Sequence, residues 1–193
     1  MELFFSEITK QLITGIISFS SIFISSITGV NPEFNSPQII IEGNSIFIST
    51  QLINYSTEEL DYIFSSGIPV KIIFSLEIYP YKTYLKPIVK KQFIREIKFD
   101  NLQHKFEVNL LDEHKKNEFN SITPAKYMLT HLSDLQIDIP MIPQNNKPFT
   151  LILSATPQYI VLSELGEKID LLLYWNLTRP KLSIELSREL FIE

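Results

Sequence analysis

The sequence predicts a mainly β protein, an antiparallel β-sandwich of the immunoglobulin-like kind with two short helices and an N-terminal apolar helix. Three observations lead to this prediction: apolar residues alternate along several segments, turn signals separate these segments, and one uncharged run lies near the N-terminus. Alternation with a period of two is typical of strands with one buried face, and short turns join antiparallel neighbours. We assign 1–35 to a signal peptide or membrane anchor with its linker, and 36–193 to the β-sandwich domain.

Residues 11–30 carry no charge. A run of about 20 such residues can cross the apolar core of a bilayer as a helix, and Lys10 precedes it, as the positive-inside rule prefers. We interpret the run as an uncleaved anchor or as a signal peptide cleaved near Gly29, and a buried first helix of a soluble protein stays open. An anchor or a signal peptide would place the domain outside the cytoplasm, in the cell envelope. Because strand signals begin only near Ile39, we expect the domain to fold without residues 1–30.

The first elements of the domain are a hairpin and a helix. The hairpin is expected over 39–52, where a Gly-Asn pair separates two β-branched runs. Apolar residues at helical spacing follow, and Ser56 and Glu59 have the spacing of a capping box, in which a hydroxyl and a carboxylate satisfy backbone amides. Gly67 can adopt the left-handed conformation that closes a helix, and Pro69 prevents its continuation.

Three alternating strands are expected next, over 70–79, 90–100 and 104–111. Apolar and polar residues alternate through each of them, and turn residues separate them. Consecutive strands of this kind form an antiparallel meander. The polar stretch over 112–121 is expected to be a loop.

A second helix is expected after this loop, with Thr123 as its N-cap and Pro124 as its first residue. Met128, Leu132 and Leu135 would form its apolar stripe. A proline-containing loop then leads to another alternating strand.

The C-terminal part of the chain is expected to add strands at 148–157 and 181–186, where apolar residues alternate. Residues 158–168 give no clear pattern. The apolar run over 169–177 fits a strand buried on both faces or a short core helix.

Composition argues against several classes of function. The net charge of −5 offers no field that would attract nucleic acid. The absence of cysteine excludes disulfides, thiolate metal sites and a cysteine nucleophile. The five glycines do not cluster as a phosphate-binding loop requires, and no serine or histidine catalytic motif occurs. The best metal candidate, 111–114, is read as a solvated loop. We expect no enzyme, no cofactor and no metal.

One segment combines basic and aromatic side chains, a pattern found at contacts with anionic lipid headgroups. The possible partner or lipid surface comprises Tyr79, Tyr81, Lys82, Tyr84, Lys86, Lys90, Lys91 and Arg95. A solvated strand edge, where lysines prevent aggregation between strands, is the other interpretation.

These observations favour a non-enzymatic binding module that is held at the membrane or exported across it. Its expected partner is an envelope protein or the membrane surface, and the oligomeric state stays open. The alternative is a carrier of a small apolar ligand or lipid, in a cavity between sheet and helices lined by residues such as Phe74, Met128 and Trp175. A large enclosed apolar pocket would favour the carrier, and a filled core would favour the binding module.

Four motifs follow one another along the domain, and they are SGIPV (66–70), REIKFDNLQHKFEV (95–108), SITPAKYMLTHLSDL (121–135) and YWNL (174–177). Their order resembles a family of short exported bacterial proteins, a domain of unknown function numbered forty-three ninety. The resemblance covers the chain from about residue 45 to residue 186. Tyr81 and Tyr84 stand where the family has tryptophans. The resemblance implies an envelope location and no known activity, and it adds no active site.

Overall fold

The structure is a computed structural model that describes residues 29–80, 86–139, 148–162 and 167–187. Every strand pairing among these residues is antiparallel, and they contain two α-helices, which confirms a mainly β chain with two helices. The apolar helix expected over 11–30 lies outside the described residues, except for its last two positions.

The larger sheet has six strands in the order β12-β9-β4-β5-β6-β7. Their bounds are β4 (Val70–Pro80), β5 (Val89–Asp100), β6 (Lys105–Leu110), β7 (Lys115–Phe119), β9 (Phe149–Pro157) and β12 (Lys181–Leu186). The expected meander is confirmed as β4-β5-β6, and the expected strands at 148–157 and 181–186 are confirmed as β9 and β12. The loop expected over 112–121 is wrong in part, because β7 occupies its middle. An edge strand buries little, so its sequence has no apolar alternation to reveal it.

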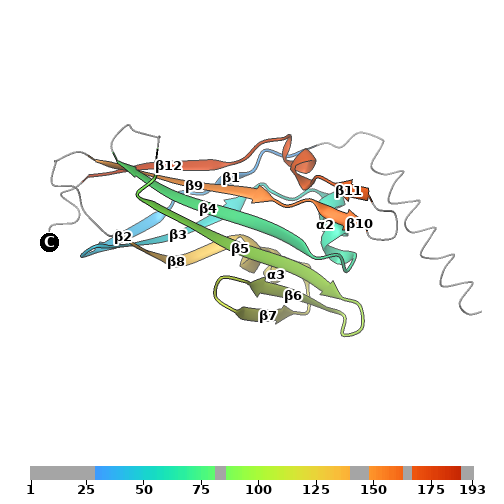
Figure 1. Cartoon of the computed structure of the whole chain (residues 1–193). Coiled ribbons are helices and arrows are strands. Elements are labelled where there is room, and N and C mark those ends of the chain that lie inside the picture. Colours follow the sequence, from blue (N-terminus) through green and yellow to red (C-terminus); the bar gives the residue numbers. More distant parts are fainter. Residues whose placement is uncertain (1–28, 81–85, 140–147, 163–166, 188–193) are drawn as a thin grey trace, which may run out of the picture.

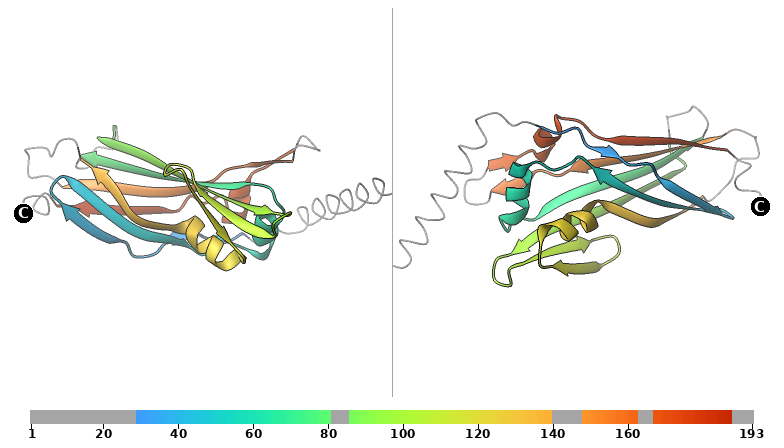
Figure 2. Two further views of the ribbon diagram at one scale, coloured as in Figure 1. Left: turned by 90° about the horizontal axis from the view of Figure 1, so that it is seen from below. Right: turned by 180° about the vertical axis from the view of Figure 1, so that it is seen from behind.

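The smaller sheet is built around β3 (Ser45–Ile53). Its other strands are β1 (Glu33–Phe34), β2 (Gln38–Glu42) and β8 (His131–Asp138). The hairpin β2–β3 confirms the prediction over 39–52, and Gly43 turns it with a φ of 55°. The smaller sheet lies across one face of the larger one, as Figure 2 shows.

The second helix is shorter than expected. The α-helix α3 (Ile122–Thr130) ends where β8 begins, so Leu132 and Leu135 belong to a strand. Both are buried although they are three residues apart, because the β3–β8 register shifts and Asp134 adopts a φ of 46°. A bulge of this kind reproduces the spacing of a helix in a strand.

The helix caps also differ from the expected ones. In α2 (Glu58–Ser65) the hydroxyl of Thr57 accepts a hydrogen bond from the Leu60 N–H, and Ser56 donates to Asp61 instead. In α3 the N-cap is Ser121, not Thr123, and its side chain makes no capping bond. A capping pattern fixes a helix start only to within a residue or two, since neighbouring hydroxyls compete for the same amides.

One end of the molecule holds α2, the 3-10 helix η1 (Leu171–Trp175), and the hairpin of β10 (Ile160–Leu162) and β11 (Glu167–Ile169), as Figure 1 shows. The apolar run over 169–177 is therefore mainly a core helix. Trp175 is fully buried and joins one apolar core with side chains of both sheets. The chain enters at the same end, because the Val30 N–H donates to the Tyr174 carbonyl at 2.9 Å.

The expected left-handed glycine is confirmed, since Gly67 has a φ of 85°. A Cβ at this position would also lie 2.6 Å from Nδ2 of Asn101. Gly67→Ala is therefore expected to lower the free energy of unfolding by about 1–2 kcal/mol, measured by urea titration. Gly43→Ala is the control, because a Cβ there meets no atom within 4 Å and only the backbone term remains. An equal loss in both variants would show that the contact with Asn101 costs nothing.

The folding of a chain without residues 1–30 stays a prediction, and the contacts of residues 29–35 with the domain refine it. Asn176 Nδ2 donates to the Gly29 carbonyl at 3.2 Å, and β1 pairs with β3. A chain of residues 29–193 is therefore expected to unfold cooperatively. A chain of residues 36–193 would lose these hydrogen bonds, each worth about 1 kcal/mol, and its urea midpoint should be lower. Equal midpoints would contradict a stabilising role for residues 29–35.

Candidate partner-binding surface

The expected surface residues do not all lie together. Tyr81, Lys82 and Tyr84 lie outside the described residues. Tyr79 and Lys90 share the outer face of the larger sheet, where Lys90 pairs in register with Glu77. We name Tyr79, Lys86 and Lys90 the distal surface.

A carboxylate organises this distal surface. The Tyr79 hydroxyl donates to Oε2 of Glu77 at 2.7 Å, and the Lys90 ammonium lies 2.9 Å from Oε1. These two donors, with the Tyr79 hydroxyl as the larger influence, hold the pKa of Glu77 below its usual range. The positive charge of Lys90 is therefore balanced by the carboxylate of Glu77. Lys86 is exposed and has no hydrogen bond or ion pair within the described parts of the chain.

Lys91 and Arg95 point to the other face of β5, so the expectation that they share one surface with Tyr79 needs correction. The Lys91 ammonium donates to the Gln136 carbonyl of β8 at 3.1 Å. Arg95 is only 2% exposed and alternates with the buried Phe93 and Ile97. A partner or a lipid headgroup cannot contact its guanidinium without unfolding the core face of the sheet.

Arg95 instead forms a clamp on the turn between β6 and β7. Its Nη1 lies 2.8 Å from Oδ1 of Asp112, and its Nη2 lies 3.0 Å from Oε1 of Glu113. The Ile94 N–H also donates to Asp112, at 3.2 Å. The stretch 111–114 is an exposed turn, as expected for a solvated loop, and two of its carboxylates pair with the buried charge of Arg95. An arginine at an inward position of an alternating strand is the signal that such partners exist.

The clamp gives a prediction for acid stability. The Lys115 ammonium bonds Glu113 at 2.9 Å and, with Arg95, holds the pKa of Glu113 low. Because this pKa is depressed on folding, its stabilisation is present above the unfolded value of about 4.3 and is lost as pH falls through the folded value. At pH values below about 4, we expect the urea concentration at the midpoint of unfolding to decrease. Glu113→Gln should make this decrease smaller. An unchanged acid profile in Glu113→Gln would contradict this.

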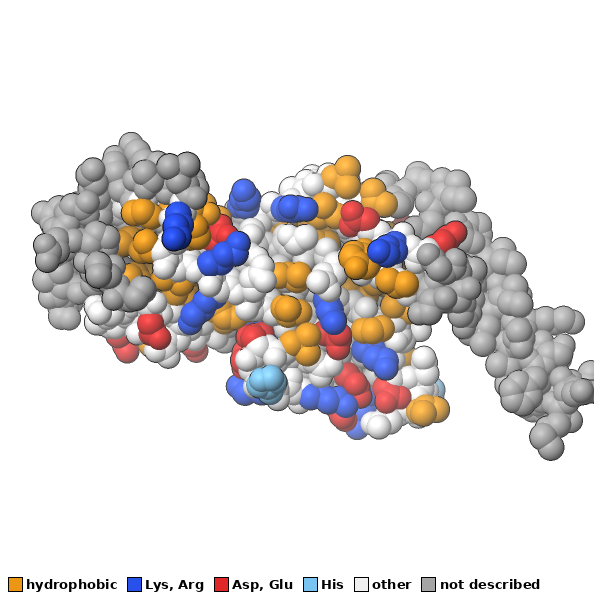
Figure 3. Space-filling model, viewed as in Figure 1, with side chains coloured by type: hydrophobic (Ala, Val, Ile, Leu, Met, Phe, Trp, Pro, Cys, Tyr) orange, Lys and Arg blue, Asp and Glu red, His pale blue; other side chains and the backbone are white. Residues whose placement is uncertain are grey.

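Opposite charges lie side by side over much of the outer face of the larger sheet, as Figure 3 shows for β5 to β7. The pairs are Lys71–Glu96, Lys90–Glu77, Lys105–Glu118, Lys116–Glu107 and Lys116–Glu118. A ladder of alternating charge lacks the uniform positive field that draws a surface to anionic lipid.

The apolar residues considered for a carrier cavity are packed into the core. Phe74 and Trp175 are fully buried, Met128 is partly buried, and the Phe74 ring lies 6.3 Å from the ring of Phe34. The Trp175 Nε1–H donates to the Tyr55 carbonyl at 2.8 Å. These residues therefore fill space between the elements rather than line an opening.

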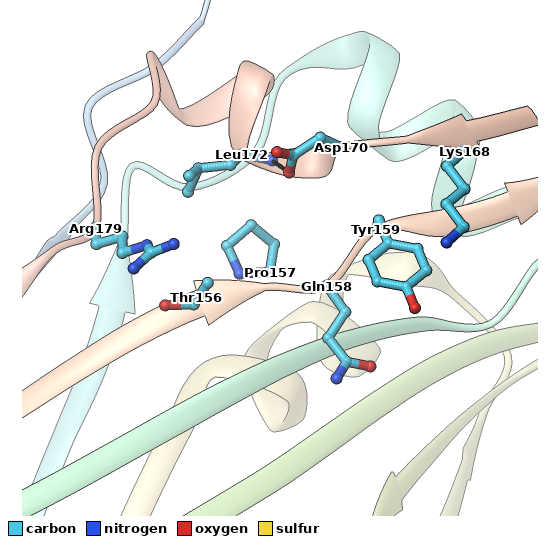
Figure 4. A pocket seen from close by; sticks show the side chains of 8 residues that line it. All are labelled: Thr156, Pro157, Gln158, Tyr159, Lys168, Asp170, Leu172 and Arg179. Atoms are coloured by element: carbon cyan, nitrogen blue, oxygen red, sulfur yellow. Dashed lines mark hydrogen bonds between the residues drawn. The ribbon is translucent and has the colours of Figure 1, made fainter.

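A hollow of about 440 Å³ opens elsewhere, beside η1 and β10, and Figure 4 shows it. We name it the proximal hollow, and its lining residues are Thr156, Pro157, Gln158, Tyr159, Lys168, Asp170, Leu172 and Arg179. They come from three separate segments, so no pattern along the sequence indicates that they lie together.

The described residues contain no group of three or more histidine or acidic side chains that could hold a metal ion. In the same part of the chain, no helix is long and apolar enough to span a bilayer.

Comparison with known proteins identifies one family. The model of the domain of unknown function DUF4390 matches residues 31–147, which is more than half of the chain. This match confirms the resemblance inferred from the motifs, over a range that begins and ends earlier than 45–186. No curated protein and no solved structure matches the chain significantly. The distal surface lies within the matched range, and the proximal hollow lies beyond it.

Proposed function

The chain belongs to the DUF4390 family, and from that premise we propose that it is a non-enzymatic binding module of the cell envelope with an immunoglobulin-like β-sandwich fold. Residues 11–30 hold it at the membrane or direct its export. The partner is an envelope protein that binds the distal surface.

The observation that carries this proposal is the separation between the chain entry and the distal surface. Val30 is bonded to Tyr174 at the end of the molecule that holds η1. Tyr79 is the last residue but one of β4, and Figure 1 shows that this end of the strand points away from α2 and η1. A strand of 11 residues spans about 35 Å, whereas charges in physiological salt interact over only about 8 Å. An anchored domain would therefore present the distal surface away from the bilayer.

Chemistry also favours a protein partner at the distal surface. Lys90 and Tyr79 are both bonded to Glu77, so they present a hydrogen-bonded pattern with little net charge. Aromatic side chains such as that of Tyr79 are enriched at protein interfaces. The exposed Lys86 adds one cation that a carboxylate of the partner can bind.

Two measurements test this function. Cell fractionation and the intact mass of the chain distinguish an anchored, an exported and a cytosolic protein. A cytosolic, full-length chain would contradict the envelope location.

The partner is tested by photo-crosslinking in intact cells, with a benzophenone amino acid in place of Tyr79. We expect an adduct of protein size that Lys86→Glu removes. Lys98→Glu is the matched control, because Lys98 is exposed near the other end of β5. Adducts of lipid size only, or an adduct that both lysine variants remove equally, would contradict a protein partner at the distal surface.

A further inference from the structure

At the end of the molecule that holds η1, hydrogen bonds hold the first described residues of the chain. Asn176 Nδ2 donates to the Gly29 carbonyl at 3.2 Å and to Oδ1 of Asn31 at 3.1 Å. A Cβ on Gly29 would lie only 2.1 Å from Oδ1 of Asn176, so the backbone approaches as closely as glycine allows. The first described residues are thereby held beside η1.

Apolar side chains project into solvent at this same end. Among the described residues, four of the nine exposed large hydrophobic side chains come from β10, from the residue before it and from the region of η1. They are Tyr159 (56% exposed), Val161 (46%), Leu173 (42%) and Leu177 (64%). Figure 3 shows hydrophobic side chains gathered there. Exposed clusters of this kind mark contacts with proteins or membranes.

The backbone of Leu177 adopts an unfavourable conformation for this residue type. Its φ is 58°, a left-handed conformation that glycine and asparagine adopt far more readily than leucine. The left-handed turn ends η1, since the Leu177 N–H donates to the Leu172 carbonyl at 3.0 Å. It leaves the leucine side chain 64% exposed, where it contributes nothing to the core.

Two cations lie beside these apolar side chains, at the proximal hollow. The Lys168 ammonium lies 5.0 Å from the centre of the Tyr159 ring, and Figure 4 shows Arg179 at the opposite side of Pro157. Neither cation has an ion-pair partner among the described residues, in contrast to the lysines of the outer face. The third charged residue of the hollow, Asp170, accepts the Leu172 N–H at 2.9 Å as the cap of η1.

We propose that this end of the domain lies on the bilayer surface, where Tyr159, Leu173 and Leu177 enter the interface and the proximal hollow binds the phosphate of an anionic lipid headgroup between Lys168 and Arg179. This inference rests on the proposed function, because residues 11–30 would bring this end to the membrane. Tyrosine and leucine beside cations suit the interface, where the apolar parts meet acyl chains and the cations meet phosphate.

The test uses the full chain in lipid nanodiscs. The chain has no cysteine, so Leu177→Cys gives a unique position for a fluorescent label, and Lys90→Cys gives the matched distal control. Lipids that carry a nitroxide on the headgroup should quench the label at position 177 and leave the label at position 90 unquenched. Equal quenching at both positions, or none at position 177, would overturn the inference.

Charge reversal tests the headgroup site itself. In discs that contain phosphatidylglycerol, Lys168→Glu with Arg179→Glu should reduce the quenching at position 177 at least severalfold, and the reduction should be smaller in discs of phosphatidylcholine alone. Lys86→Glu, on the distal surface, should leave the lipid quenching at position 177 unchanged in these discs, which hold no protein partner. Quenching that the double variant leaves intact in both lipids would overturn the headgroup site.

Flotation of the same nanodiscs separates the two proposals. A chain that inserts but shows no quenching at position 177 contradicts this inference alone. A chain that does not float with the discs contradicts the anchor, and the inference falls with it.

Discussion

Trp175→Ala is expected to lower the free energy of unfolding by about 3–5 kcal/mol, as large aromatic truncations in cores do. Trp175 is fully buried, and its Nε1–H donates to the Tyr55 carbonyl at 2.8 Å. Tyr55 in turn donates its hydroxyl to the Lys126 carbonyl at 3.1 Å, so the indole connects η1 with the segments around both α-helices. Urea titration followed by circular dichroism measures the loss without relying on tryptophan fluorescence.

The hydrogen bond and the packing of Trp175 can be separated. Trp175→Phe keeps a large ring but leaves the Tyr55 carbonyl without this donor, and its cost should be about 1–3 kcal/mol. Leu173→Ala is the control on the same 3-10 helix, where the side chain is exposed, and it should change stability by less than about 0.5 kcal/mol. A Trp175→Ala loss no larger than that of Leu173→Ala would contradict the role of the indole.

Removing both carboxylates of the clamp, with Asp112→Asn and Glu113→Gln, is expected to lower the free energy of unfolding by about 3 kcal/mol. The buried Arg95 guanidinium would keep its charge and lose both anions. Arg95→Met should cost less than the double variant, because an apolar side chain of similar length needs no partner in the core. Urea titration at pH 7 measures both.

The surface pair Lys105–Glu118 provides the matched control for the clamp. Both of its side chains are 39% exposed, whereas the Arg95 side chain is 3% exposed. Glu118→Gln should therefore cost less than about 1 kcal/mol. If Arg95→Met proved as costly as the loss of both carboxylates, the buried charge would not be the origin of the effect.

The burial of Arg95 also shows why the expected surface was only partly right. The mixture of basic and aromatic residues around β5 does not tell which side chain points outward, whereas the alternation of Arg95 with Phe93 and Ile97 does. The pairing of β5 with β4 puts Lys90 beside Glu77 on one face, and Arg95 faces the core with Phe93. The distal surface is therefore smaller and less basic than the sequence pattern indicates.

The C-terminal third has the weakest secondary-structure pattern in its sequence. The apolar run over 169–177 fits a strand as well as a helix, since continuous burial removes the period that distinguishes them. In the structure Asp170 caps η1 and Asn176 ends it in the left-handed region. This local turn sets where Leu177 lies relative to Lys168 before η1 and Arg179 after it.

The sequence by itself determined the mainly β class, the meander β4–β5–β6, the hairpin β2–β3 and the glycine that ends α2. Period, turn residues and the special freedom of glycine are local properties, so the order of residues is enough to reveal them. It also determined the family, through motifs that follow one another along the chain.

Only the tertiary structure decided which charges are free. Lys90 is paired with Glu77, Arg95 is buried against Asp112, and Lys168 and Arg179 keep no anionic partner in the described part of the chain. These arrangements depend on pairing between strands and on turns from separate segments. Charge pairing acts across space over a few ångströms, and residues distant in sequence come that close only when the sheets are assembled.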